Sequence, residues 1–482
     1  MKTFWKYTLI TILMLCGLFM LGVLFLFFVP GSSLFGITYV SLNNEYYSKA
    51  YAITDLDKVV FNSRAYKVNL VPASTENISV KVYSNAVGFT RTKYSNVNLT
   101  ANSKNGVLSL EVEEPHGLVL NNKSFVELRL PKNMTADLVM SNRRADVTIE
   151  NESLNISNFK YTTQSGALKL NAGTIGGNID LEMNNGDALI NEKFGLNNNN
   201  VSLSIKNGLF DASASKLGDV TITNNTRGVI KIKECNKLTE RVEVAGGRLE
   251  LNQIGSIDVQ TSDSDVYINK LIHGGTIYLN NTNSSNGKVD INETNAETDI
   301  RTKEGSIWVK KATTGLFVES SSGDIKVENV STSVNAKTTY GNIEVYFDEN
   351  APKNSGTNHA RELTAETSNG KITSTGAENV RVTVTNKGRV ELILNDVVGD
   401  NYVRGKDGNV SVKVNKDAVY DLTTGSDQGD VSVNLLQLGE FGGYTTNVER
   451  TTHVNHIETD TVNNFLKVTT LSGDLYIRDT GL

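Results

Sequence analysis

Ser321-Ser-Gly-Asp-Ile-Lys-Val327 is a short sequence unit in which a polar turn with a glycine corner precedes alternating apolar and polar residues. The same unit recurs as Gln164-Ser-Gly-Ala-Leu-Lys-Leu170 and Leu471-Ser-Gly-Asp-Leu-Tyr-Ile477. Alignment gives fifteen corners, and thirteen of the fourteen intervals between them are 17 to 29 residues long. The corners are Gly166, Gly186, Gly208, Gly228, Gly247, Ser264, Gly287, Gly305, Gly323, Gly341, Gly370, Gly388, Gly408, Gly429 and Gly473. Units this short must stack on one another to bury an apolar face.

The residue two positions after each corner is apolar in all fifteen units, and the residue after it is mostly polar. Such alternation is typical of a strand with one buried face. Weaker copies at half the period, such as Gly177-Asn-Ile-Asp-Leu181, indicate at least two strands in each coil. The sequence therefore predicts an all-β fold, a parallel β-solenoid (β-helix) with rungs of about 18–22 residues. A β-propeller is the alternative, because two units would fit one blade of ~40–45 residues.

The corners also account for the composition. Glycine adopts backbone angles that are closed to most residues, and we expect Asn, Asp or Ser beside it to hydrogen-bond its own turn. The chain contains 56 Asn and 40 Gly residues among 482. This composition needs no bound ligand to explain it.

The N-terminal segment 7–29 carries no charged residue and is long enough to cross a hydrocarbon core of ~30 Å as a helix. Lys2 and Lys6 precede it, which favours a cytoplasmic tail at 1–6 and an extracytoplasmic position for the rest of the chain. A cleaved signal peptide is the alternative, although its apolar region is usually only ~7–15 residues long. We therefore expect a single-pass transmembrane helix in the cell membrane, followed by a linker at 30–50.

The remaining domain boundaries follow from where the repeat begins and ends. Residues 51–135 alternate well but lack the repeat, so we predict an N-terminal β cap. Residues 136–434 carry the solenoid repeats, and 435–482 hold an insertion, the last rung and a C-terminal cap. Caps are expected because an open sheet edge would pair with other chains.

Composition excludes several function classes. The formal net charge is −6, from 47 Lys+Arg and 53 Asp+Glu residues, which argues against nucleic-acid binding. The two cysteines, Cys16 and Cys235, are too few for a disulfide framework or a cysteine metal site. The sequence also contains no phosphate-binding glycine loop and no nucleophile elbow.

The order of several motifs resembles a known family. Val126-Glu-Leu-Arg-Leu-Pro131, Leu138-Val-Met-Ser-Asn142 and the serial Ser/Asn-Gly-Asp-Ile/Val units together resemble the bacterial putative-adhesin family of β-strand-repeat domains. The resemblance covers roughly residues 50 to 480 and implies an envelope location and a β-solenoid. It brings no catalytic residues, because the activity of the family is largely uncharacterised. Arg143-Arg144-Ala145-Asp146 departs from the family pattern, where a Ser-Gly-Asp unit would be expected.

Parallel β-helices also include polysaccharide lyases and hydrolases, whose acids or calcium ligands project from adjacent rungs. The acidic candidates for such a role are Asp263, Asp265, Asp290 and Asp299. They occupy corner or outward positions and form no obvious pair, so we predict no catalytic residue and no enzyme activity. His453 and His456 match no defensible zinc spacing, and we predict no metal site and no cofactor.

Four aromatic residues, by contrast, are candidates for surface contacts with a ligand. Tyr267, Trp308 and Tyr476 occupy outward positions, and Tyr278 lies in a half-period strand. An exposed ring on a flat sheet offers an apolar face on which a sugar ring can stack. Aromatic residues are also ordinary strand formers, so this pattern alone does not establish a site.

These observations favour an extracytoplasmic β-solenoid of adhesin type, with a binding or structural role at the cell envelope. The expected partners are the membrane, through 7–29, and a cell-wall polymer, a host surface or an envelope protein. One alternative is an accessory subunit of an envelope-stress or transport complex in the membrane. A second alternative is a carbohydrate-active β-helix enzyme.

Overall fold

The computed structural model describes residues 2–28, 33–34, 37–52, 56–64, 67–91, 98–113, 117–144, 146–196, 198–241, 246–280, 287–350, 361–435, 439–454 and 463–480. The chain forms two compact units, one of Met1–Ser202 with Gly208–Ser215 and one of Leu203–Asn207 with Lys216–Leu482. Both units consist mostly of strands that are largely parallel and stack in a solenoid-like way, as predicted, and one apolar helix lies at the N-terminus.

The first unit contains the helix and the strands up to the start of β18. These elements are α1 (Lys2–Phe28), β1 (Ser33–Leu34), β2 (Ile37–Tyr51), β3 (Lys58–Ser63), β4 (Lys67–Pro72), β5 (Ile78–Arg91), β6 (Asn98–Lys104), β7 (Val107–Glu113), β8 (Gly117–Asn122), β9 (Phe125–Leu130), β10 (Asn133–Met134), β11 (Asp137–Asn142), β12 (Val147–Ile156), β13 (Phe159–Ser165), β14 (Leu168–Ile175), β15 (Ile179–Asn185), β16 (Ala188–Ile190), β17 (Phe194–Leu196) and β18 (Val201–Arg241), whose residues belong to both units.

The second unit contains the rest of β18 and all later strands. These are β19 (Arg248–Thr261), β20 (Asp265–Leu271), β21 (Gly275–Leu279), β22 (Val289–Thr294), β23 (Thr298–Thr302), β24 (Ile307–Val309), β25 (Leu316–Ser320), β26 (Ile325–Val330), β27 (Ser333–Thr338), β28 (Ile343–Phe347), β29 (Glu362–Asn369), β30 (Ile372–Ala377), β31 (Asn379–Lys387), β32 (Val390–Leu394), β33 (Asp400–Arg404), β34 (Val410–Val414), β35 (Tyr420–Leu435), β36 (Gly439–Val454), β37 (Phe465–Thr470) and β38 (Leu475–Asp479).

Helix α1 matches the predicted apolar segment. Its span Phe4–Phe25 has a mean hydropathy of 2.5, and none of that span is buried in the protein. A helix of this length and composition serves either as a membrane anchor or as a signal sequence. Val29, the last residue of the predicted span, lies outside the described residues.

Within each unit, strands two apart in the sequence pair in parallel, so each coil contributes two strands. In the second unit β20, β22, β24, β26, β28, β30, β32 and β34 follow one another on one side, and β21, β23, β25, β27, β29, β31 and β33 on the other. In the first unit β11, β13 and β15 alternate in the same way with β12, β14 and β16. The prediction of largely parallel coils with at least two strands each is therefore confirmed.

The predicted apolar column forms the core. Its fifteen residues are at most 1% exposed, and where the pairing is described they oppose one another in register, as Ile307, Ile325 and Ile343 do. The column consists of Leu168, Ala188, Phe210, Ile230, Leu249, Val266, Val289, Ile307, Ile325, Ile343, Ile372, Val390, Val410, Val431 and Leu475. Since the side chains of a strand alternate between its faces, the polar residues between them point outward.

The corner glycines stack directly on one another. A Cβ atom at Gly341 would overlap the carbonyl oxygen of Gly323, and one at Gly370 would overlap that of Gly341. The same overlap would occur at Gly186, Gly208, Gly323, Gly388, Gly408, Gly429 and Gly473. Glycine is therefore required here mainly because backbone approaches backbone; at Gly208 and Gly408 a φ of 141° and 146° adds a second reason.

Buried hydroxyl groups close these corners from inside. The amide of Gly341 donates to the Thr338 hydroxyl at 3.1 Å, and that hydroxyl donates to the carbonyl of Gly323 at 3.3 Å. Ser320 and Ser426 make the equivalent pairs of bonds. A Ser or Thr three residues before the glycine thus satisfies backbone groups that the tight corner would otherwise leave unpaired.

The polar residue after the glycine behaves differently from the expectation that it bonds its own turn. The Asp324 carboxylate accepts the amide of Asn342 at 2.8 Å, and the Asn342 side chain accepts the amide of Lys371 at 2.9 Å. These bonds link one rung to the next. Side-chain ladders do the same on the outer faces, where Asn292 donates to Asn269 and Asn269 donates to Asn252. Many of the asparagine side chains therefore form hydrogen bonds between coils.

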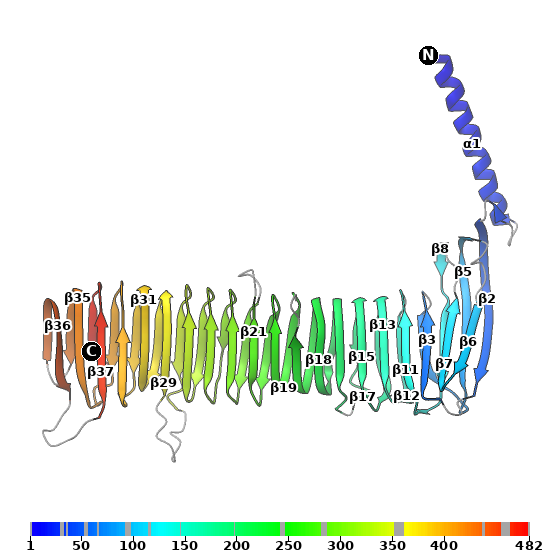
Figure 1. Ribbon diagram of the computed structural model, residues 1–482. Coiled ribbons are helices and arrows are strands. Elements are labelled where there is room, and N and C mark those ends of the chain that lie inside the picture. The colour runs from blue at the N-terminus through cyan, green and yellow to red at the C-terminus, as the bar shows by residue number, and fades with distance from the viewer. Residues whose placement is uncertain are drawn as a thin grey trace. The chain divides into compact units, whose positions relative to one another are not determined.

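At the C-terminal end, the order of the strands in the stack departs from their order in the chain. The prediction placed the rung of Gly429 directly after that of Gly408, but β38 pairs with both β34 and β35 and so lies between them. Likewise β37 pairs with β33 and β35 (Figure 1). Strand β36 runs antiparallel along β35.

The N-terminal end shows a similar rearrangement. Strands β3 and β4 pair in parallel with β11 and β12 on one side and with β7 and β9 on the other. Strand β6 then pairs antiparallel with β7, and β5 pairs antiparallel with β9, β8 and β2. Antiparallel strands at the ends protect parallel edges that would otherwise recruit other chains, which is why the fold is mixed and not wholly parallel.

Candidate functional site

The four predicted aromatic residues do not form one patch. Tyr267, Trp308 and Tyr476 share an outward column on one side of the coils, whereas Tyr278 lies on the other. Two rungs separate Tyr267 from Trp308, and six separate Trp308 from Tyr476, or ~10 Å and ~29 Å at ~4.8 Å per rung. The structure confirms that they face outward but does not bring them together.

Neighbouring cations cover two of these rings. The guanidinium of Arg248 lies 4.4 Å from the centre of the Tyr267 ring. Lys310 and Lys326 place their ammonium groups 4.5 Å and 5.4 Å from the Trp308 ring. These cation–π contacts stabilise the outer face of the sheet and occupy surface that a ligand would need.

Sequence reasoning missed an exposed tyrosine at another place. Tyr402 of β33 is 44% exposed, and its ring packs edge-on against Phe465 of β37 with 6.2 Å between centres. The alternation of Tyr402, Val403 and Arg404 is visible in the sequence and places Tyr402 and Arg404 outward. Its partner Phe465 could not be identified that way, because the two residues are far apart in the chain.

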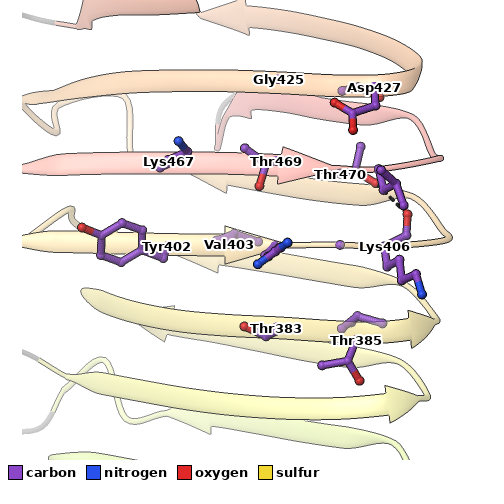
Figure 2. A pocket seen from close by; sticks show the side chains of 15 residues that line it. Thr383, Thr385, Tyr402, Val403, Lys406, Gly425, Asp427, Lys467, Thr469 and Thr470 are labelled. Atoms are coloured by element: carbon purple, nitrogen blue, oxygen red, sulfur yellow. Dashed lines mark hydrogen bonds between the residues drawn. The ribbon is translucent and has the colours of Figure 1, made fainter. Parts of the chain in front are cut away.

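Tyr402 borders a groove of about 810 Å³ across the strands near the C-terminal end of the second unit (Figure 2). The floor follows a ladder in which Thr383 pairs with Arg404, Arg404 with Thr469, and Thr469 with the buried Gly425. Two threonines and a glycine have short side chains or none, so the surface is hollow there. Because β37 lies between β33 and β35, residues of three distant segments meet in this groove.

The groove is positively charged in a chain of net negative charge. Among the described residues, Arg404, Lys406 and Lys467 line it together with a single acid, Asp427. Arg404 and Lys406 are exposed, and neither forms an ion pair within the described part of the chain. Unpaired cations in a concave surface attract anionic ligands and can donate charge-assisted hydrogen bonds to them.

The acids considered as catalytic candidates have partners within the sheet: Asp265 and Asp290 contact the next rung, and Asp299 pairs within its own strand. The Asp265 carboxylate accepts the amide of Lys288 at 3.1 Å, Asp290 lies 3.6 Å from Lys310, and Asp299 binds Arg301. Asp263 also has a partner.

A metal site would need ligands that lie close together. No group of three or more His, Cys, Asp or Glu side chains that could hold a metal ion occurs among the described residues. His456 lies outside those residues, so the predicted pair of histidines has no described geometry.

One carboxyl has a strongly altered acidity. Burial raises the pKa of Glu240 to about 7, and the side chain of Asn225 offsets part of that rise. Glu240 is fully buried and lies opposite the buried Val259 of the next rung. Raised carboxyl pKa values are common in catalytic acids, but a group sealed in the core does not meet a ligand on the surface.

Two overlapping parts of the chain, residues 56–270 and 197–375, match the family model described as toastrack DUF4097. Together they cover more than half of the 482 residues. The chain belongs to the toastrack DUF4097 family. The groove of the toastrack chain lies beyond the matched residues, since its lining begins at Thr383.

Three solved structures similar to this toastrack chain are described as adhesins. A putative cell adhesion protein from Clostridium sporogenes ATCC 15579 has 8% identity over 91% of this chain and 100% of its own, with a TM-score of 0.16. A putative adhesin from Parabacteroides distasonis ATCC 8503 has 16% identity over 73% and 99%, with a TM-score of 0.19. A putative adhesin from Bacteroides fragilis NCTC 9343 has 11% identity over 63% and 98%, with a TM-score of 0.20.

The predicted resemblance to the putative-adhesin family is thus confirmed. At these identities and TM-scores, the solved structures carry no argument about the groove. Comparison of the sequence with curated proteins gives no match.

Proposed function

We propose that this toastrack protein is a single-pass, membrane-anchored β-solenoid of adhesin type, exposed outside the cytoplasmic membrane. It acts by binding or as a structural element of the cell envelope, and not by catalysis. The observation that carries this proposal is the apolar span Phe4–Phe25, which is unburied and follows Lys2 at its N-terminal end. An unburied apolar helix is stable in a bilayer, and the preceding positive charge favours a cytoplasmic N-terminus.

Further support comes from the surface of the coils. Outward positions carry polar side chains, and the acids that would be needed for glycan hydrolysis engage in ion pairs and ladder bonds instead. A surface of this kind suits attachment to a polymer. If a panel of polysaccharides incubated with the full chain developed new reducing or unsaturated ends, the non-catalytic part of the proposal would be wrong.

Labelling of intact cells tests the location. Asn335→Cys introduces a thiol at an exposed, outward position of β27, and we expect a membrane-impermeant maleimide to label it without lysis. Wild-type protein is the matched control and should stay unlabelled, because Cys16 lies within α1 and Cys235 is only 2% exposed. The labelled protein should have its full-length mass and remain in the membrane fraction.

Two results would contradict this proposal in different ways. Labelling that requires lysis would place the coils in the cytoplasm. A released protein that lacks α1 would identify the helix as a signal sequence and not an anchor.

A further inference from the structure

We propose that the groove bordered by Tyr402 binds an anionic glycan, a chain of sugar rings that carry carboxylate or phosphate groups. This inference rests on the proposed function only in that an extracytoplasmic protein meets such polymers. The binding itself is a property of the purified chain and can be tested separately.

The shape of the groove suits an extended polymer. Its floor crosses β31, β33, β37 and β35, which follow one another in steps of ~4.8 Å. A chain of sugar rings, each about as long as one step, can follow such a ladder. The absence of a side chain at Gly425 and the short chains of Thr383 and Thr469 leave the room for it.

The chemistry of the lining also fits. The ring of Tyr402 offers an apolar face to sugar C–H groups, while Thr383, Thr385 and Thr469 offer hydroxyls to sugar oxygens (Figure 2). The guanidinium of Arg404 can bind a carboxylate or a phosphate with two hydrogen bonds. A site that combines one ring, several hydroxyls and cations recognises both the sugar and its charge.

Local charge selects an anionic ligand. Three cations and one acid line the groove, whereas the whole chain has a net charge of −6. The neighbouring acid on the floor ladder, Glu366, pairs with Lys337 at 3.4 Å and therefore does little to oppose an anion.

The same features disfavour other polymers. Strand β33 is already paired on both sides, so an acidic peptide could not add to the sheet as a strand. Single-stranded nucleic acid usually stacks successive bases on several aromatic side chains, and Tyr402 is the only aromatic residue among the described residues that line the groove.

Binding of defined glycans to the purified full-length protein tests the proposal. The probes are an oligogalacturonate, which carries carboxylates, and a phosphate-bearing mannan, which distinguishes the two sources of charge. Fully methyl-esterified oligogalacturonate has the same backbone without the charge, and polyglutamate has the charge without the sugar. We expect binding to at least one anionic glycan, weakening as salt increases, and at least ten-fold weaker binding of the ester and of polyglutamate.

Variants then locate the site. The double variant Arg404→Gln/Lys406→Gln should weaken binding at least ten-fold and flatten its salt dependence. The matched control Arg227→Gln/Lys233→Gln removes two exposed cations of β18 and should bind as wild type. Tyr402→Leu should weaken binding without changing the salt dependence, because the ring contributes no charge. Far-UV circular dichroism and limited proteolysis confirm that each variant is folded.

Several outcomes would overturn the proposal. These are no binding to either anionic glycan, equal binding of the ester or of polyglutamate, and equal loss of affinity in both double variants. None of them bears on the location of the protein, which the labelling of intact cells decides independently.

Discussion

Val334→Asp is expected to lower the free energy of unfolding of the second unit by about 4 kcal/mol, because it places a carboxyl in the dry core. Val334 of β27 is 2% exposed and lies between Leu316 and Leu363 of the neighbouring rungs. These two leucines offer the carboxyl no hydrogen bond in place of the water that it would lose. Urea unfolding of the full-length protein, followed by circular dichroism, measures the change.

Asn335→Asp is the matched control, since it introduces an aspartate at the next position, on the opposite face of the strand. Asn335 is exposed and lies between Phe317 and Thr364, so the new charge lies opposite no acid on either adjacent rung. Its unfolding midpoint should stay close to that of wild type. Equal loss of stability in the two variants would contradict the assignment of inward and outward faces.

Gly186→Ala should destabilise the first unit by about 2–3 kcal/mol through steric overlap. The added methyl group would overlap the carbonyl oxygen of Gly166 on the adjacent rung. Neither backbone can move away without breaking the parallel ladder between β14 and β16. The expected result is a lower unfolding midpoint and faster proteolysis of the first unit.

Gly176→Ala provides the comparison within the same unit. The nearest atoms to its new methyl group would be the side-chain oxygen of Asn155 and the carbonyl oxygen of Ile156, both 3.9 Å away. This substitution should leave the midpoint nearly unchanged or raise it slightly, since alanine restricts the unfolded chain. If Gly176→Ala were the more damaging of the two, stacking of the corners would not be the reason for glycine.

The repeat reveals which residues face the core, because a period of two within each unit and one glycine per coil are local signals. It does not reveal which strand lies beside which. Val410 and Val431 belong to consecutive units in the sequence, yet Leu475 lies between them in the stack. That order rests on the pairing of β38 with both β34 and β35, and no periodic pattern encodes it.

The candidate site was missed for the same reason. Tyr267, Trp308 and Tyr476 were correctly placed outward, but their separation along the stack prevents a joint site. The groove requires Arg404, Thr469 and Gly425 on adjacent rungs, although Arg404 and Thr469 are 65 residues apart in the chain. Only the position of β37 between β33 and β35 brings these residues together.

A disulfide cross-link tests the order of the coils most directly. The test uses a chain in which Cys16 is replaced by alanine and Ser411 and Tyr476 are replaced by cysteine. The two new cysteines should form a disulfide on mild oxidation, because the Cα atoms of these positions oppose each other on adjacent rungs at ~5 Å. Burial raises the pKa of Cys235 to about 12, so its thiol stays inert.

Cysteines at Ser411 and Ser432 lie two rungs apart, ~10 Å, which exceeds the reach of a disulfide. We predict a cross-link for the pair at 411 and 476 and none for the pair at 411 and 432, read by non-reducing electrophoresis and intact mass. The reverse result would mean that the coils follow chain order to the end, and both the stack described here and the groove would be wrong.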